Sequence, residues 1–355
     1  KHNRFIFFLL AIFLCGGYMT GSDWRSYETS YNGADWSNLK YYLSEKSFFV
    51  LMILSKNIIN DFFTFLILSK FLVFYTILNF LKKFSPNIFF SSFFYIPLFG
   101  LFLFIDNPLR YMIALGFITI SYKYLLNENF FKFMILVLIA SLFHITALIF
   151  VPFYFLKKIN ISRFLLSIIF LCWTFFFTTE HLLNIINFFN NYIPSTILSF
   201  SNYLITALSY DQVFSIGSIM NVVFFFWIIF NKNEIKNNLK HGEIFYSMSI
   251  IYLFFTKLSV VFPTAFRFSY LFAPFFIVTL TYVFLRNKNI YKQFFSAGIA
   301  IYIFLFTYQK INNHYVYIPY TNYFTYVITD NLINYYERSK HNLIEFYNRK
   351  GYYYY

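Results

Sequence analysis

Charge is the scarcest property of this sequence. Only 12% of its 355 residues are Asp, Glu, Lys or Arg, whereas 59% are hydrophobic, and the mean hydropathy is +0.58. A soluble domain needs far more charge to cover its surface. Several apolar runs approach the roughly 20 residues with which a helix crosses a bilayer, and a backbone in lipid must satisfy its own hydrogen bonds. The composition therefore predicts an all-α, polytopic integral membrane protein.

Cysteine and acidic residues are also rare. The two cysteines, Cys15 and Cys172, both lie within apolar runs, which argues against a structural disulfide. The 14 Asp and Glu residues limit metal and carboxylate-pair mechanisms. The chain has no G-x-x-x-x-G-K-[ST], H-E-x-x-H, G-x-S-x-G, D-x-D or Cys-pair zinc spacing, so the usual nucleotide, zinc and serine-hydrolase sites have no support. We therefore expect neither a metal nor a cofactor.

Basic residues are in excess, and they give a formal net charge of +14. They are scattered in short clusters between apolar runs, which is the positive-inside pattern that orients membrane helices. We therefore expect membrane lipid, and no nucleic acid, around these charges. The first apolar run, from Phe5, follows basic residues but has no small-x-small cleavage site, which predicts an uncleaved first helix.

The apolar runs predict about 9–11 transmembrane helices in a single polytopic membrane domain over residues 1–355. The clearest runs lie near 5–20, 61–81, 88–105, 109–126, 161–179, 213–230, 244–262, 266–285 and 291–308. The stretch 41–57 has an apolar centre that is too short to cross, which predicts an interfacial helix or a dip into the membrane. The tail, 309–355, is polar and rich in tyrosine, and we assign it no chemistry.

The apolar stretch 131–156 is ambiguous, and the charges that follow it decide between two topologies. If it crossed once, Lys157, Lys158, Arg163 and the later basic loops would lie outside, against the positive-inside rule. We therefore predict a re-entrant hairpin that enters and leaves on the cytoplasmic side and turns at 143–145; the alternative places the missing crossing in 180–212. Segments 21–60 and 180–212 then face the outer side.

His144 would lie at the tip of this hairpin. Irregular backbone at membrane depth is tolerated only where protein or a water-filled cavity surrounds it. The position therefore favours a functional histidine over a core histidine with one hydrogen-bond partner.

Segment 21–37, on the predicted outer side, is rich in acidic, amide and aromatic residues. Aromatic rings near carboxylates suit carbohydrate, because sugar C–H faces stack on rings while hydroxyls bond to acids. The segment is therefore a candidate carbohydrate-binding surface. An interfacial belt of Trp and Tyr is the alternative explanation.

Two arginines lie near the predicted outer ends of helices. In D-N-P-L-R, Asn107 suits an N-cap and Pro108 the first helical position, so Arg110 lies in the first turn. There the free backbone N–H groups, the positive end of the helix dipole and a guanidinium converge, which predicts an anion site. In F-P-T-A-F-R-F-S-Y, Arg267 follows Pro263 by one turn at a similar predicted depth. An interfacial arginine that snorkels to lipid headgroups is the alternative.

The order of these motifs resembles the EpsG-like group of Wzy-type bacterial polysaccharide polymerases. The similar motifs are D-x-x-x-Y (Asp23, Tyr27), R-Y-x-I-A (from Arg110), F-H-I-T-A-L-I (around His144) and R-F-S-Y (Arg267 to Tyr270). They cover most of the chain in order. A further pattern of O-antigen polymerases, Arg and Gly separated by ten residues, does not fit, because Ser121 stands eleven residues after Arg110.

The resemblance implies a multi-pass glycosyltransferase of the bacterial inner membrane, with an architecture like that of the GT-C enzymes. Such an enzyme joins undecaprenyl-diphosphate-linked oligosaccharide repeats, as in O-antigen and lipopolysaccharide synthesis, on the periplasmic side. A chain-length regulator protein is a further partner that it implies.

In this interpretation Arg110 and Arg267 bind the diphosphate. His144 orients the acceptor hydroxyl or accepts its proton, and Asp23 or Glu45 is also able to accept that proton. Asp23, Tyr27, Glu45 and Tyr270 bind sugar. Three alternatives remain open: a flippase or transporter of the same lipid-linked oligosaccharide, an O-antigen ligase-like transferase, and a membrane acyltransferase.

Overall fold

The described part of the chain consists of helices and the turns and loops that join them. The computed structural model describes residues 2–41, 46–176, 178–190, 216–262, 265–286, 290–313, 317–329 and 335–349. In these ranges the only pairing of β type is one isolated bridge, between Gly17 and Asn322. The predicted all-α class is therefore confirmed. The chain forms two compact units, one of residues 1–83, 88–148 and 288–355 and the other of residues 84–87 and 149–287.

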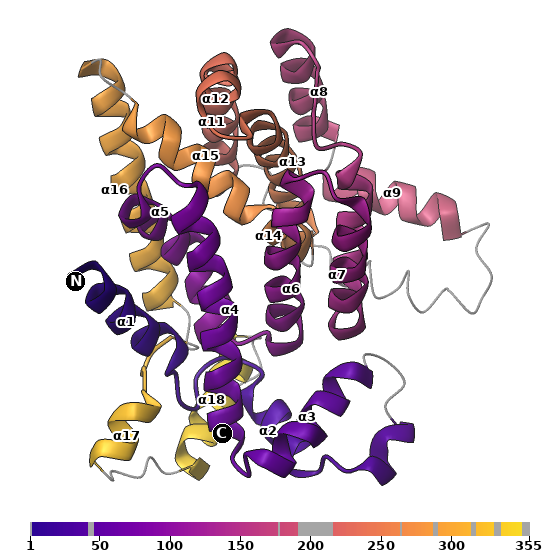
Figure 1. Cartoon of the computed structure of the whole chain (residues 1–355), viewed down its shortest axis with the longest axis vertical. Coiled ribbons are helices and arrows are strands. Elements are labelled where there is room, and N and C mark those ends of the chain that lie inside the picture. The colour runs from indigo at the N-terminus through magenta and orange to yellow at the C-terminus, as the bar shows by residue number, and fades with distance from the viewer. Residues whose placement is uncertain are drawn as a thin grey trace. The chain divides into compact units, whose positions relative to one another are not determined.

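The first unit contains the N-terminal helices and the C-terminal tail (Figure 1). Its elements are α1 (His2–Cys15), α2 (Trp24–Asn32), η1 (Trp36–Tyr41), α3 (Lys46–Ile58), α4 (Phe62–Phe84), α5 (Ile88–Tyr95), η2 (Ile96–Gly100), η3 (Phe102–Asp106), α6 (Leu109–Leu126), α7 (Phe130–Phe143), α16 (Ile290–Asn313), α17 (Tyr323–Thr329) and α18 (Tyr335–Arg349). The predicted span 88–105 is one helical stretch that ends in the π-helical turns η2 and η3. Pro97 lies in this stretch and lacks the N–H of a regular helical bond.

The second unit is built around α13 (Gly242–Val261), which contacts five other helices of the unit. These are α8 (Arg163–Phe176), α11 (Ile216–Phe230), α12 (Lys232–Asn238), α14 (Phe266–Tyr270) and α15 (Ala273–Leu285). A further helix, α9 (Thr179–Asn190), precedes α11 in the chain. The predicted span 266–285 is divided between α14 and α15, because the chain turns at 271–272 before Pro274 in the first turn of α15.

Three helices in the described ranges are long and apolar enough to cross a bilayer. They are α4, α13 and the segment Gln293–Asn312 of α16, and a fourth results if α11 and α12, which meet at 59°, form one broken span. Several of the other predicted spans are shorter apolar helices in the structure, α1, α8 and α15 among them. The protein is thus a polytopic helical membrane protein, whereas the total of 9–11 spans stays a prediction.

Helices α6 and α7 lie side by side in Figure 1 and share many contacts. They are joined by residues 127–129, where the Asn129 side chain accepts a hydrogen bond from Lys132 N at 3.1 Å and caps α7. The bounds of α6 agree with the predicted span 109–126. α7 ends at Phe143, one residue before the extended His144 (φ −153°, ψ 118°), and the 3₁₀ segment η4 (Ile145–Tyr154) follows. The helix thus ends within the predicted turn at 143–145. The re-entrant topology of 131–156 stays a prediction.

The C-terminal tail packs against the loop that follows α1. Tyr18 N donates to Thr321 O at 2.9 Å, and Tyr323 N donates to Gly16 O at 2.8 Å. From α18, the buried Arg338 donates to Met19 O at 3.1 Å. The tail, to which the sequence analysis assigns no chemistry, therefore helps to fix the loop that leads into α2.

Candidate functional site

Two loops of the first unit are tied together just before α2 and α6. Gly21 has a φ of +91°, and Ser22 N donates to Asp106 Oδ1 at 3.0 Å. In the other direction the buried Asn107 donates through Nδ2 to Thr20 O at 2.7 Å. These reciprocal bonds fix where α2 and α6 begin relative to each other.

The start of α6 differs by one residue from the prediction. Asn107 is not the N-cap: it has a left-handed backbone (φ 62°, ψ 55°) and its amide is used on the neighbouring loop. Pro108 is the N-cap, and its carbonyl accepts the first helical bond from Met112 N at 2.8 Å. The reason is that Asn is one of the few residues that tolerate the left-handed conformation this tight turn requires. Arg110 nevertheless lies in the first turn, as predicted.

Aromatic side chains anchor α2 against the start of α4. The buried Trp24 packs on Phe63, with ring centroids 6.1 Å apart. Tyr31 stacks on Phe65 at 5.2 Å, and its hydroxyl donates to the carbonyl of Ile59. With this face buried, α2 presents Tyr27 toward α3 and α6.

Tyr27 meets Arg110 of α6. The guanidinium carbon of Arg110 lies 6.0 Å from the centre of the Tyr27 ring, a cation–π arrangement. Phe48 of α3 packs edge-on against the same ring at 5.6 Å. Burial raises the pKa of Tyr27, and Arg110 acts in the opposite direction. The phenol is therefore protonated at neutral pH and able to donate a hydrogen bond beside the guanidinium.

His144 packs against the residue that follows Arg110. Its ring is edge-on to Tyr111, with centroids 5.4 Å apart and planes at 82°. Its Nδ1 lies 2.7 Å from Thr146 Oγ1, which fixes the orientation of the ring. Nδ1 also accepts a hydrogen bond from Thr146 N at 3.4 Å, and while it does so the proton of the neutral ring is on Nε2. In the other tautomer Nδ1 donates to the Thr146 hydroxyl, and Nε2 is then able to accept a proton.

The structure thus brings together four of the residues singled out from the sequence. Asp23 directly precedes α2 and lies one turn before Tyr27; Tyr27 contacts Arg110; and Tyr111 links Arg110 to His144. This arrangement combines a guanidinium, the N–H groups of a helix N-terminus, a phenol and an imidazole. Such a site is able to bind an anion and to move a proton next to it.

The other predicted residues belong to the second unit or fall outside the described part of the chain. Arg267 and Tyr270 belong to α14 of the second unit, where each packs near Phe266: the Arg267 guanidinium carbon at 5.8 Å and the Tyr270 ring at 5.5 Å from its ring centre. Glu45 and Pro263 lie outside the described residues. Among the described residues, no group of three His, Cys, Asp or Glu side chains is placed to hold a metal ion.

Sequence reasoning missed Tyr111, Thr146 and Lys70. Tyr111 and Thr146 stand inside the motifs of Arg110 and His144, but their contacts arise only from packing. Lys70 lies within α4, is 0% exposed, and its Nζ has no hydrogen-bond partner in the described part of the chain. A lysine inside a 23-residue membrane helix was the signal available in the sequence.

The sequence profile of the EpsG family matches residues 2–326 of the 355. No curated protein and no solved structure matches the chain. The family match includes the loop before α2, the first turn of α6, His144 and α14, so it covers every motif on which the resemblance was based. Because it extends over most of the chain, the protein belongs to the EpsG family and is a membrane protein of polysaccharide biosynthesis.

Proposed function

We propose that this protein is a polysaccharide polymerase. It joins undecaprenyl-diphosphate-linked oligosaccharide repeat units at the periplasmic face of the bacterial inner membrane, as a metal-independent glycosyltransferase. The observation that carries the proposal is the convergence of Tyr27, Arg110 and His144 at the first turn of α6 in a chain of the EpsG family.

The leaving group of such a reaction is a lipid diphosphate. Arg110 and the N–H groups of the first turn of α6 interact with its phosphoryl oxygens and stabilise the charge that develops as the bond to the sugar breaks. The forked donors of a guanidinium match these oxygens. Arg267 supplies the second cationic contact in this proposal.

The acceptor is a sugar hydroxyl of a second repeat unit. Its oxygen forms a bond to the anomeric carbon of the donor, while the bond from that carbon to the diphosphate breaks and its electron pair leaves with the diphosphate. The hydroxyl proton passes to His144 Nε2 in the tautomer that is protonated at Nδ1, in which Nδ1 donates to the Thr146 hydroxyl. Attack in one step inverts the anomeric configuration. Asp23, Tyr27, Glu45 and Tyr270 bind the sugars.

The test is the length distribution of surface polysaccharide in a strain that lacks this protein. The strain is re-supplied with the wild type, Arg110→Ala or His144→Ala, and the polysaccharide is separated by size. The matched controls are Arg25→Ala and His181→Ala, because both side chains are exposed and neither belongs to the proposed machinery. We expect the deletion to leave only single repeats, and the two site variants to reduce polymer about 10²–10³-fold, the usual loss when one stabilising group is removed.

Two results would overturn the proposal. Loss of even single repeats in the deletion strain would indicate a flippase or a ligase instead. An unchanged length distribution would exclude a role in polymerisation. Equal losses in the site variants and in their exposed controls would remove the assignment of the site, once immunoblots show equal amounts of each protein in the membrane.

A further inference from the structure

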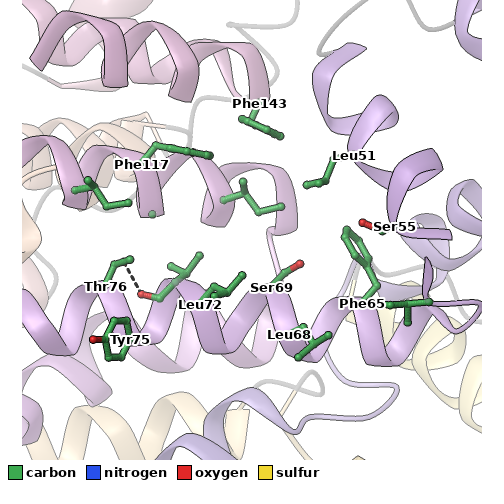
Figure 2. A pocket seen from close by; sticks show the side chains of 15 residues that line it. Leu51, Ser55, Phe65, Leu68, Ser69, Leu72, Tyr75, Thr76, Phe117 and Phe143 are labelled. Carbon is green, nitrogen blue, oxygen red and sulfur yellow. Dashed lines mark hydrogen bonds between the residues drawn. The ribbon is translucent and has the colours of Figure 1, made fainter. Parts of the chain in front are cut away.

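An apolar groove lies in the first unit, where α4 faces α6 and α7 (Figure 2). Its volume is about 520 Å³, within the usual range for small-molecule sites. Phe117 of α6 and Phe143 of α7 face α4 across the groove, and Leu51 of α3 closes one end. The Thr76 hydroxyl in its wall is satisfied by its own helix, since it donates to Val73 O at 2.8 Å. The groove therefore offers a hydrocarbon surface with little polar character.

The groove is open on the side where its lining side chains are exposed. Three of its lining side chains are well exposed: Leu68 to 47%, Leu72 to 69% and Ile120 to 43%. Leu68 and Leu72 belong to α4, one of the helices that is able to cross a membrane. With α4 as a membrane span these side chains face lipid, so a lipid ligand has access to the groove without crossing water.

Two helices connect the groove with the candidate site. On α6, Arg110 lies in the site and Ile113, one turn later, lines the groove. On α7, Phe143 lines the groove and stacks on Phe117 at 5.5 Å, while the next residue, His144, lies in the site. The groove therefore begins within one helical turn of the guanidinium and the imidazole.

Helix α3 makes the same connection independently. Its Phe48 packs against Tyr27 in the site, and Leu51, one turn further along, lines the groove. Three separate elements thus contribute one residue to the polar site and a neighbouring one to the apolar groove. A ligand with an anionic head and a long hydrocarbon chain is the class that fits both parts at once.

We propose that this groove binds the polyprenyl chain of the lipid-linked diphosphate whose head lies at Arg110. The lining of α4 extends from Phe65 to Thr76, about 16 Å at 1.5 Å per residue, so it holds the part of the chain next to the diphosphate and leaves the rest in the bilayer. The identity of the head group rests on the proposed function; the fit of an anionic amphiphile rests on the groove and site alone.

The test is photolabelling of the full-length protein in vesicles of phosphatidylethanolamine and phosphatidylglycerol. The probe is a polyprenyl diphosphate with a diazirine in its prenyl chain near the head. We expect labelled peptides from α4 and α6 between 65–76 and 113–120, and loss of this label with excess unlabelled polyprenyl diphosphate but not with excess phosphatidylglycerol. Leu72→Trp, which fills the groove, should reduce the label about tenfold, equivalent to about 1.4 kcal/mol of binding free energy.

The matched control is Leu138→Trp. Leu138 is 50% exposed on α7 but does not line the groove, so the label should be unchanged. Equal competition by phosphatidylglycerol would show a general lipid surface and overturn the proposal, as would label confined to other helices or equal losses in the two tryptophan variants. If polymer length depends on this protein but the groove is not labelled, the groove proposal fails alone. If the groove is labelled specifically but the length distribution is unchanged, the polymerase proposal fails alone.

Discussion

At the scale of single residues, the site depends on two backbone positions with positive φ. Gly21 (φ +91°) and Asn107 (φ +62°) lie in the two loops that hold α2 against the start of α6. Neither conformation suits an ordinary side chain, and each allows a bond between the loops that a regular turn would not make. Arg110 and Tyr27 meet because these two residues bend the chain.

The substitution Gly21→Ala should therefore destabilise the protein. A Cβ at this position would lie 2.5 Å from the carbonyl oxygen of Asp106, and alanine disfavours the positive φ, so we expect a loss of about 1–3 kcal/mol. The measurement is thermal unfolding of the purified protein in detergent.

Gly298→Ala in α16 is the matched control, because a Cβ there has no atom within 4 Å. Replacing a glycine in a helix should leave stability unchanged or raise it by about 0.5–1 kcal/mol. Equal melting temperatures for the Gly21→Ala variant and the wild type would show that the loop relaxes freely, and would contradict the role given to this turn.

At the scale of elements, helix α4 combines a membrane span with an unexpected cation. It is 23 residues long and mostly apolar, yet Lys70 is fully buried in its middle, and its Nζ has no hydrogen-bond partner in the described structure. Burial of an unpaired cation is costly. Lys70 therefore lowers the free energy of unfolding of the protein.

We expect Lys70→Met to raise the melting temperature, because methionine has a similar shape and no charge to desolvate. The control is Lys82→Met at the end of the same helix, where the lysine is exposed and its replacement should change stability little. Both variants are compared with the wild type by thermal unfolding in the same detergent. A lower melting temperature for Lys70→Met would mean that the ammonium is stabilised in the membrane by a bound partner.

At the scale of the whole molecule, the contacts of the tail predict that it lies on the same side of the membrane as the candidate site. Arg338 of α18 bonds to Met19, just after α1, and the loop 16–23 leads directly into the site. Because segment 21–60 is predicted to face outward, the tail should face outward as well. The hairpin prediction places Lys158 on the opposite side.

Cysteine labelling tests both statements. In a variant without the native thiols Cys15 and Cys172, a cysteine at the exposed Lys340 should react with a membrane-impermeant maleimide applied to spheroplasts. A cysteine at the exposed Lys158 should react only after the membrane is permeabilised. Ready labelling at Lys158 from outside would contradict the re-entrant model, and protection at Lys340 would place the tail, and with it the site, on the cytoplasmic side.

Local signals in the sequence were enough for much of this picture. Hydropathy predicted the helical membrane class and the bounds of α6, and the charges around 131–156 led to a break at 143–145, where α7 ends before His144. The motifs of Asp23 and Arg110 indicated the family that the profile match confirms. These properties depend on the spacing and polarity of neighbouring residues, so a single sequence contains them.

Tertiary structure alone decided which of these residues meet. That Tyr27 contacts Arg110, and that Tyr111 links Arg110 to His144, follows from how α2, α6 and α7 pack. The positive φ of Asn107 displaced the N-cap that the sequence had predicted by one residue. The groove beside the site likewise has no signature in sequence, because its wall is assembled from helices that are distant in the chain. Residue types and periodicity determine helices, whereas the side chains packed between helices determine the site.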